Sequence, residues 1–320
     1  MPVTRRQPPM PVASPAVITA PRAPARPAPP GPADLAPAAL AAAHGLTVSG
    51  ARPGIVEYTR RLWARRHFVA TFAAARQAAL YSDARLGQLW QVLTPLLNAA
   101  VYFLIFGLLL GAGRGVTDYI PFLCTGVFVF TFTQSAVLGG ARSLTDNIGL
   151  VRALHFPRAC LPIAATLLQL RQLLLSLGVL SVIVVAEGIP VTTRWLLAVP
   201  ALALQSLFNA GLALGLARVG ARTTDFAQVL PFVLRTWMYV SGVFYDLSRF
   251  TVGAPHAVAM MLNVNPALVY VGLMRFALID SVTREQLPPH IWPLAVGWAA
   301  VAACAGYAFF WSSEEEYGRG

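Results

Sequence analysis

The sequence has no lysine, because all 24 of its basic residues are arginine. The phosphate-binding loop of P-loop ATPases uses a lysine to contact the β and γ phosphates of ATP, so this chain has no such ATP site. Lysine is also required for Schiff-base and pyridoxal-phosphate chemistry, which excludes those enzyme classes. If ATP drives this protein, another chain must hydrolyse it.

Charged residues and cysteines are also scarce. Only 12% of the residues are charged and 57% are hydrophobic, whereas about a quarter of the residues in a soluble domain are charged, so the lipid bilayer is the expected solvent. Cys124, Cys160 and Cys304 stand far apart in apolar surroundings, without the paired spacing of a zinc site or a disulfide framework. The five histidines are also scattered. We therefore expect no metal site and no catalytic group of side chains.

The net charge of +11 comes largely from the region before the first long apolar stretch, which holds 11 of the arginines. We attribute this charge to a cytoplasmic face and to anionic lipid headgroups, not to nucleic acid. Residues 1–54 contain 13 of the 25 prolines and no apolar core. This composition predicts a disordered cytoplasmic tail.

Residues 55–88 form a basic segment with helical periodicity. Its apolar side chains fall on one side at about 100° per residue, although Arg65 and Arg76 interrupt them. They are Tyr58, Leu62, Val69, Phe72 and Leu80. We predict an amphipathic helix in the plane of the lipid headgroups, with a solvated basic helix as the alternative.

Six apolar stretches of roughly 20 residues follow, the length that a bilayer core of about 30 Å requires. They are residues 92–110, 120–139, 161–186, 195–216, 226–245 and 291–311. Residues 254–262 and 266–279 are apolar but too short to cross, which predicts re-entrant or interfacial helices. The expected fold is an all-α integral membrane protein with a six-helix membrane domain at residues 89–320.

The distribution of arginine orients these helices. Short loops on one side contain Arg142, Arg152, Arg158, Arg218 and Arg222, against Arg114 and Arg194 on the other. Arginine-rich loops stay in the cytoplasm, and an even number of spans returns the chain to its starting side. We therefore expect a multi-pass protein of the cytoplasmic membrane with both termini in the cytoplasm.

The loop at residues 142–158 contains a helix signal. Asp146 is a candidate N-cap for a helix at residues 147–154, and Pro157 ends the stretch. A short helix parallel to the membrane is what a transport protein needs to receive force from an ATPase. Many other membrane proteins have such loops, so the signal is weak by itself.

Motifs from Tyr58 onward resemble the ABC-2 type permeases, and most closely those that export O-antigen, teichoic acid or galactan on a lipid carrier. The shared pattern begins with Ser82, Leu86-Gly87, Leu89-Trp90, Pro95-Leu96, Tyr102 and Phe106. It continues with Asn147, Leu150-Val151-Arg152, Phe156-Pro157 and Pro162, and then with Asp225 and Asn265-Pro266 with Arg275. Two positions depart from it. Thr224 stands where the family usually has arginine, and Gly242 stands where it often has proline.

The resemblance implies a homodimer with a channel at its interface, two copies of a nucleotide-binding ATPase subunit, and a lipid-linked polysaccharide as substrate. ATP and magnesium would bind to the ATPase, so this chain itself would carry no cofactor. The ATPase-coupling residues would be Asp146, Asn147, Leu150, Val151, Arg152, Phe156, Pro157 and Asp225.

Two arginines lie within the expected spans. Residues 173–186 alone would make only about 21 Å of helix, so Arg171 enters the membrane with its span, and Arg235 lies mid-span. An arginine at a helix centre costs roughly 2.5–3.5 kcal/mol, and no carboxylate lies inside any span. Their partners are either amides, backbone carbonyls and water, or an anionic substrate such as a diphosphate, whose oxygens match the guanidinium fork.

Aromatic side chains recur in these spans. They are Tyr102, Phe106, Phe128, Phe132, Trp237 and Tyr239. Sugar rings present flat C–H faces that stack on aromatic rings, so a polysaccharide channel would use such side chains. Alternatively, they face lipid, neighbouring helices or the membrane interface.

Two other functions stay open. An integral membrane glycosyltransferase would need a carboxylate at the outer edge of an early span, and Asp118 is the candidate. An ABC-2 exporter of small hydrophobic compounds would differ from a polysaccharide exporter only in its substrate.

Overall fold

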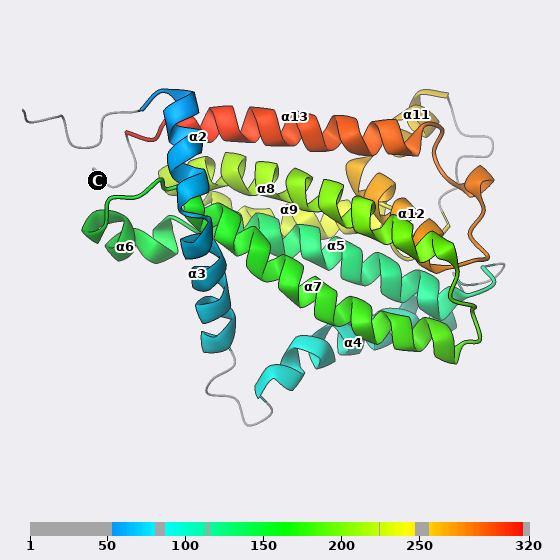
Figure 1. The fold of residues 1–320 in the computed structure, drawn as a ribbon. Helices are drawn as coiled ribbons and strands as arrows, with labels where there is room; N and C mark the ends of the chain where they lie inside the picture. The colour runs from blue at the N-terminus through cyan, green and yellow to red at the C-terminus, as the bar shows by residue number, and fades with distance from the viewer. Residues whose placement is uncertain are drawn as a thin grey trace, which may run out of the picture. The chain divides into compact units, whose positions relative to one another are not determined.

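The computed structural model describes residues 53–80, 87–111, 113, 116–223, 225–246 and 256–315. The chain divides into two units between residues 49 and 50, and all the described residues belong to the second. The predicted tail at residues 1–54 lies outside them, apart from its last two positions. In the described part of the chain, all regular secondary structure is helical (Figure 1), as the sequence predicts.

The helices follow one another as the apolar pattern predicts. The long ones are α4 (Trp90–Tyr102), α5 (Tyr119–Arg142), α7 (Cys160–Ala186), α8 (Ala198–Arg222), α9 (Phe226–Val240) and α13 (Ile291–Trp311). α4 continues as a π-helix (Phe103–Leu109), and a 3-10 turn (Thr193–Leu197) precedes α8. The shorter ones are α2 (Ile55–Ala64), α3 (Arg66–Ala79), α6 (Ile148–Ala153), α11 (His256–Val264) and α12 (Pro266–Leu278). Short 3-10 turns occupy Gly87–Leu89, Thr145–Asn147 and Arg284–Gln286.

Within the described residues, 5 helical segments are long and apolar enough to cross a membrane. They are Trp90–Leu109, Tyr119–Arg142, Cys160–Ala186, Thr193–Arg222 and Ile291–Trp311, and they match the first four predicted spans and the last. The predicted span at 226–245 is shorter in the structure, because α9 ends at Val240 after 15 residues, about 22 Å of helix. The chain turns at Gly242, whose φ is 63°, a conformation that glycine adopts without strain. A total of six spans therefore stays a prediction.

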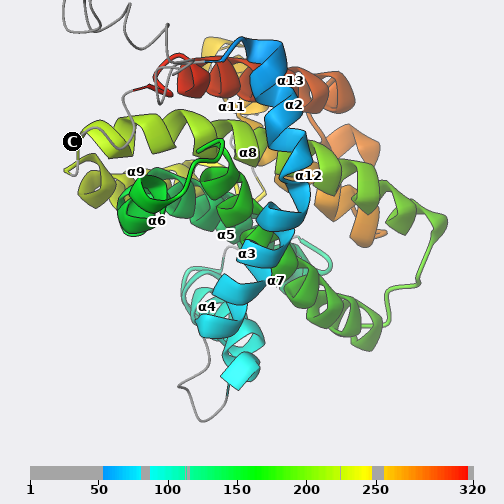
Figure 2. The same cartoon turned by 60° about the vertical axis from the view of Figure 1, so that its left-hand side comes forward.

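α5 lies at the centre of the bundle and packs on both α7 and α8 (Figures 1 and 2). The apolar stretch of α5 is 72% buried within the chain. The stretch formed by α4 and its π-helix, Trp90–Leu109, is only 11% buried, and we call it the α4 segment. Glycine lets the backbones approach closely, since a Cβ at Gly220 would lie 2.1 Å from the carbonyl oxygen of Ala141. Small residues at helix contacts are typical of packing inside a membrane. By contrast, the α4 segment leaves most of its surface without a partner in this chain.

The predicted amphipathic helix at residues 55–88 is divided in the structure. It breaks at Arg65 into α2 and α3. Val69 and Ala73 are buried against the first turns of α7, whereas Leu80, at the far end of the predicted stripe, is exposed. The bundle itself therefore covers part of the apolar stripe that the sequence assigns to the bilayer.

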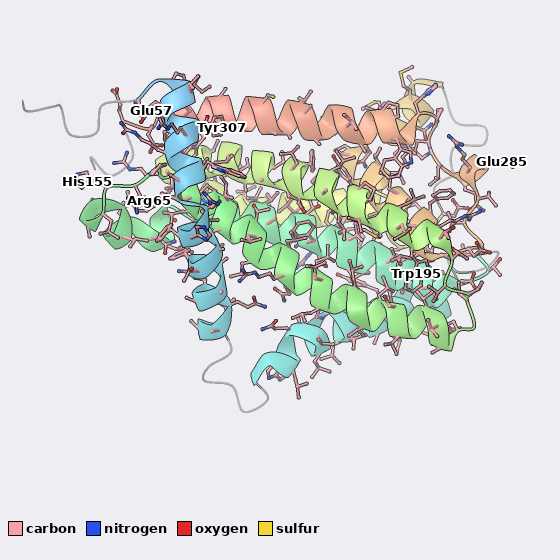
Figure 3. The ribbon with its side chains drawn as sticks, in the orientation of Figure 1. Glu57, Arg65, His155, Trp195, Glu285 and Tyr307 are labelled. Atoms are coloured by element: carbon pink, nitrogen blue, oxygen red, sulfur yellow. The ribbon has the colours of Figure 1, made fainter. Side chains whose placement is uncertain are left out.

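The bundle has two chemically different ends. α2, α6 and the last turn of α13 lie at one end, named here the α6 end, and α12 lies toward the other, the α12 end (Figure 1). Figure 3 shows Arg65 and His155 at the α6 end and Trp195 and Glu285 at the α12 end. The arginines of the α6 end include Arg142, Arg152, Arg158, Arg218 and Arg222.

Candidate functional site

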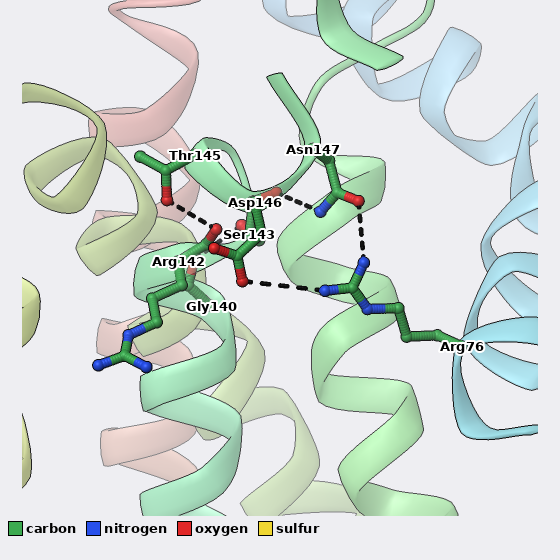
Figure 4. Close-up of polar contacts among 7 residues, drawn as sticks. All are labelled: Arg76, Gly140, Arg142, Ser143, Thr145, Asp146 and Asn147. Carbon is green, nitrogen blue, oxygen red and sulfur yellow. Dashed lines mark hydrogen bonds and ion pairs between the residues drawn. The ribbon is translucent and has the colours of Figure 1, made fainter. Parts of the chain in front are cut away.

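The segment between α5 and α7 forms a tight turn followed by α6 (Figure 4). Ser143 Oγ donates to the carbonyl oxygen of Gly140 at 2.7 Å, and Asn147 Nδ2 donates to the carbonyl oxygen of Ser143 at 2.7 Å. The N-cap of α6 is Asn147, and no side chain caps the helix. The prediction that Asp146 caps this helix is therefore wrong.

Asp146 and Asn147 instead contact α3 through Arg76 (Figure 4). The Arg76 guanidinium donates to Asn147 Oδ1 at 3.1 Å and lies 3.8 Å from a carboxylate oxygen of Asp146. The two charged side chains are 45% and 48% exposed, so the ion pair orients the turn and adds little stability. The sequence prediction did not include Arg76. Its available signal was an arginine on the apolar side of the amphipathic stripe.

Three predicted coupling residues anchor α6 to the bundle. Val151 is buried, and Leu150 packs on the cluster around Tyr58. Phe156 lies against α3, with its ring centroid 5.4 Å from that of Phe68. These side chains fix the position of α6, so they do not form its outer surface.

Other residues form the outer surface of this segment. Ile148 and Leu154 expose 41% and 52% of their surface, and Arg152 between them is also exposed. We call these three residues the α6 surface. Asp225 is exposed immediately before α9, and Pro157 is half-buried at the end of the segment. Apolar side chains beside an arginine are typical of a surface that binds another protein.

A second group of predicted residues gathers where the α4 segment meets α9. Phe244 stacks on Phe106 with ring centroids 4.4 Å apart, and its ring lies 4.7 Å from Tyr102 and 5.5 Å from Tyr239. We call these four residues the aromatic cluster. Phe106 belongs to the π-helix, an irregularity that is frequent at functional sites. The predicted site did not include Phe244, although the crowding of aromatic residues at the end of the predicted span was a signal for it.

Arg235 lies one helical turn before Tyr239 on α9, and its side chain is exposed. Phe232, on the same side of the helix, exposes 74% of its surface. Within the described residues, the Arg235 guanidinium has no hydrogen bond or ion pair. Backbone carbonyls of the described chain therefore do not satisfy this arginine.

The other predicted channel residues have different surroundings. Phe128 and Phe132 are buried in the core around α5. Trp237 Nε1 donates to Asn265 Oδ1 at 2.9 Å and thereby joins α9 to the start of α12. Arg171 is half-buried on α7 and makes no hydrogen bond with the rest of the described chain. The aromatic cluster thus contains three of the six predicted aromatic residues.

Arg275 is a structural arginine of the bundle and lies in the stretch at residues 266–279 that the sequence predicts as a re-entrant or interfacial helix. Its side chain is buried in α12, where Nε donates to the carbonyl oxygen of Phe122 at 3.1 Å. Nη1 and Nη2 donate to the carbonyl oxygens of Gly242 and Val243 at 3.0 and 2.7 Å. The guanidinium therefore links α12 to α5 and to the turn after α9, directly before Phe244 of the aromatic cluster.

Comparison with known proteins identifies the family. Residues 69–279 match the sequence profile of the ABC-2 type transporters, a stretch that includes the coupling segment and the aromatic cluster. The chain belongs to the ABC-2 type transporter family. It is therefore a multi-pass membrane protein, and the family match favours a transporter over a membrane glycosyltransferase with Asp118 as catalytic carboxylate. Asp118 instead accepts a hydrogen bond from Ser281.

Three relatives of this transporter carry related names. The O-antigen export system permease protein RfbA of Myxococcus xanthus is 26% identical over 266 residues, which cover 82% of this chain and 98% of the relative. Two proteins of the same name from Klebsiella pneumoniae are 24% and 23% identical over 187 residues, or 58% of this chain and 70% of each relative.

Proposed function

We propose that this ABC-2 transporter is the transmembrane subunit of an exporter that moves a lipid-linked cell-surface polysaccharide across the bacterial cytoplasmic membrane. The names of the three relatives support this substrate class. The observation that carries the proposal is Arg235, which has no partner in the described chain and lies beside the aromatic cluster. This combination suits a substrate that joins phosphate groups to sugar rings.

The translocation route lies between two copies of the chain in this proposal. The α4 segment is only 11% buried, and Phe232 and Val229 of α9 are more than half exposed. A second copy would cover these surfaces and enclose Arg235 with the aromatic cluster. The guanidinium fork would contact phosphate oxygens, and Tyr239 would stack on sugar rings.

A separate ATPase chain supplies the energy, because this chain has no lysine for a P-loop. ATP and magnesium bind to that ATPase. It docks on the α6 surface, where Ile148 and Leu154 are exposed and where Arg76 holds the preceding turn. Motion of the ATPase then reaches α5 and α7 through the ends of this segment.

The α6 end faces the cytoplasm in this proposal, and both termini lie on that side. The arginines of the α6 end support this orientation through the positive-inside rule. At the α12 end, by contrast, Asp118, Asp280 and Glu285 accompany Arg194 and Arg284.

Reconstitution tests the proposed function. The transporter and its partner ATPase are placed in inside-out vesicles with lipid-linked O-polysaccharide in the outer leaflet, and MgATP is added outside. We expect the polysaccharide to become protected from added periodate with ATP, and to stay accessible with a non-hydrolysable analogue. Unprotected polysaccharide together with ATP-driven uptake of a small hydrophobic dye would instead identify an exporter of small compounds.

A further inference from the structure

A buried carboxylate joins three separate parts of the chain at the α6 end. Tyr58 Oη on α2 donates to Glu314 Oε2 at 2.8 Å, and the Ala159 N–H donates to the same Tyr58 oxygen at 3.2 Å. The Arg158 N–H donates to Glu314 Oε1 at 3.0 Å, and the Arg158 guanidinium donates to the Glu314 carbonyl oxygen. We call these four residues the Glu314 junction.

The junction is buried and polar inside an apolar cluster. Tyr58 exposes 1% of its surface, Ala159 0% and Glu314 7%. Leu161, Phe310 and other apolar side chains surround it. Burying a carboxylate is unfavourable unless hydrogen bonds replace its water, and apolar residues could fill the same space. The hydrogen bonds from Tyr58 and Arg158 offset this cost and at the same time bind the acid to the residues that precede α7.

The position of the junction indicates its role. Arg158 and Ala159 directly follow Pro157, the end of the coupling segment, and directly precede α7. Glu314 follows the end of α13, and Tyr58 lies on α2. The junction thus connects the point where the coupling segment enters the membrane domain to two helices that are far away in the sequence.

We propose that Tyr58 and Glu314 are positioning residues that make α2 and the end of α13 move together with the coupling segment during transport. This inference rests on the proposed function, in which an ATPase displaces α6. When the first turn of α7 moves, the hydrogen bonds of Arg158 and Ala159 carry Glu314 and Tyr58 with it. Without the junction, α7 moves alone, and ATP hydrolysis is less efficiently converted into export.

The chain offers a matched control for this inference. Thr59 and Tyr307 share a hydrogen bond of 2.7 Å that also joins α2 to α13, and Figure 3 shows Tyr307 beside α2. This bond does not include Arg158 or Ala159. Tyr307→Phe therefore weakens the contact between α2 and α13 while leaving the connection to the coupling segment intact.

The test measures the amount of polysaccharide exported per ATP hydrolysed by the full transporter–ATPase complex in vesicles. Tyr58→Phe keeps the buried ring and removes the shared hydroxyl. We expect the amount exported per ATP to fall about fivefold, which is the lower end of the effects that coupling between two sites usually has. Glu314→Ala should do the same. Glu314→Gln should retain most of the ratio, because its amide still accepts from Arg158 and can donate to Tyr58. Tyr307→Phe should leave the ratio unchanged.

The outcomes separate the two claims. An unchanged ratio in Tyr58→Phe and Glu314→Ala would overturn the junction proposal and leave the proposed function standing. An equal fall in Tyr307→Phe would also overturn it, because general weakening of the contact between α2 and α13 would then explain the effect. If the unmodified complex hydrolyses ATP without exporting polysaccharide, the proposed function fails, and the junction proposal fails with it.

Discussion

The Arg275 guanidinium carbon lies 3.3 Å from the centroid of the Phe122 ring. A cation over an aromatic face is favourable, especially away from water, and three carbonyl oxygens complete the environment of this arginine. Arg235 has no comparable partner among the described residues. Arg275 therefore has a structural role, whereas Arg235 has no such contacts, and we propose a functional role for it, although the sequence alone presents both as arginines near apolar stretches.

Removing Arg275 should destabilise the transporter. Arg275→Leu removes three buried hydrogen bonds and leaves the carbonyl groups of Gly242 and Val243, which lie outside the helices, without this donor, at a cost of about 1–3 kcal/mol each. We expect a clearly lower thermal unfolding temperature in detergent. Arg275→Lys should also be destabilising, since an ammonium group cannot reproduce the planar fork. Arg284→Leu, at an exposed position, is the control, and equal stability of the Arg275 and Arg284 variants would contradict the structural role.

Phe244 should be the residue on which the aromatic cluster depends. It is fully buried, so Phe244→Ala leaves a cavity and should cost about 3–5 kcal/mol. Leu196→Ala, at an exposed position before α8, should change the unfolding temperature little in detergent. Thermal unfolding of both variants checks this difference, and a Phe244→Ala protein as stable as Leu196→Ala would show that the cluster is not packed as described.

The α6 surface should control ATPase binding. Ile148→Asp and Leu154→Asp together place two carboxylates on an exposed surface, so the protein should still fold. Its affinity for the ATPase should fall at least about tenfold, because docking would remove water from the new charges. Arg76→Ala should weaken binding less, by loosening the turn. Arg66→Ala, an exposed arginine of α3 that contacts Trp63, serves as control. Unchanged affinity of the double variant, measured by pull-down of purified ATPase, would exclude this surface.

Glu314 should make stability depend on pH in a defined direction. Burial raises the pKa of its carboxyl above the ordinary 4.5, while hydrogen bonds from Arg158 and Tyr58 and the Arg158 charge oppose the shift. Between 4.5 and the raised pKa, the folded state binds more protons than the unfolded chain, so stability falls as pH rises through this window. The neighbouring titratable groups are Tyr58, Tyr307, Arg158 and Cys160.

The measurement is the difference in unfolding temperature between the native protein and Glu314→Gln from pH 4 to pH 8. The amide of this variant cannot ionise, so the native protein should lose stability relative to it as pH rises. Glu57→Gln, in an exposed pair with Arg61, is the control, because the lowered pKa of Glu57 gives the opposite slope. A pH-independent difference for Glu314→Gln would contradict the buried environment of the carboxylate.

The helices were predictable from sequence because each depends on a local property, the length of an apolar run. The short α9 was not, since its end is set by the positive φ of Gly242 within a continuous apolar stretch. Likewise, the apolar stripe of 55–88 was visible, but its burial under α7 depends on contacts between distant segments.

The candidate site was likewise predictable from the sequence only in part. Arg235 and Tyr239 could be selected as candidates from the sequence because a charge and an aromatic ring stand out within an apolar run. The contact of Asp146 was not predictable, because its partner Arg76 lies on a helix far away in sequence, and the N-cap of α6 is the next residue, Asn147. Val151 and Leu154 are both apolar residues of one loop, and only the packed structure distinguishes the buried one from the exposed one.

Export by Arg235→Leu tests the central claim most directly. If Arg235 lines the translocation route, the variant should insert into the membrane and bind its ATPase. It should unfold at the native temperature or above, because the substitution removes a charge from an apolar surface. Polysaccharide export should fall at least about tenfold, as expected for the loss of a charge-assisted hydrogen bond. Arg235→Lys should retain part of the export, because the charge remains without the fork. Native export by Arg235→Leu in the reconstituted vesicles would contradict the account.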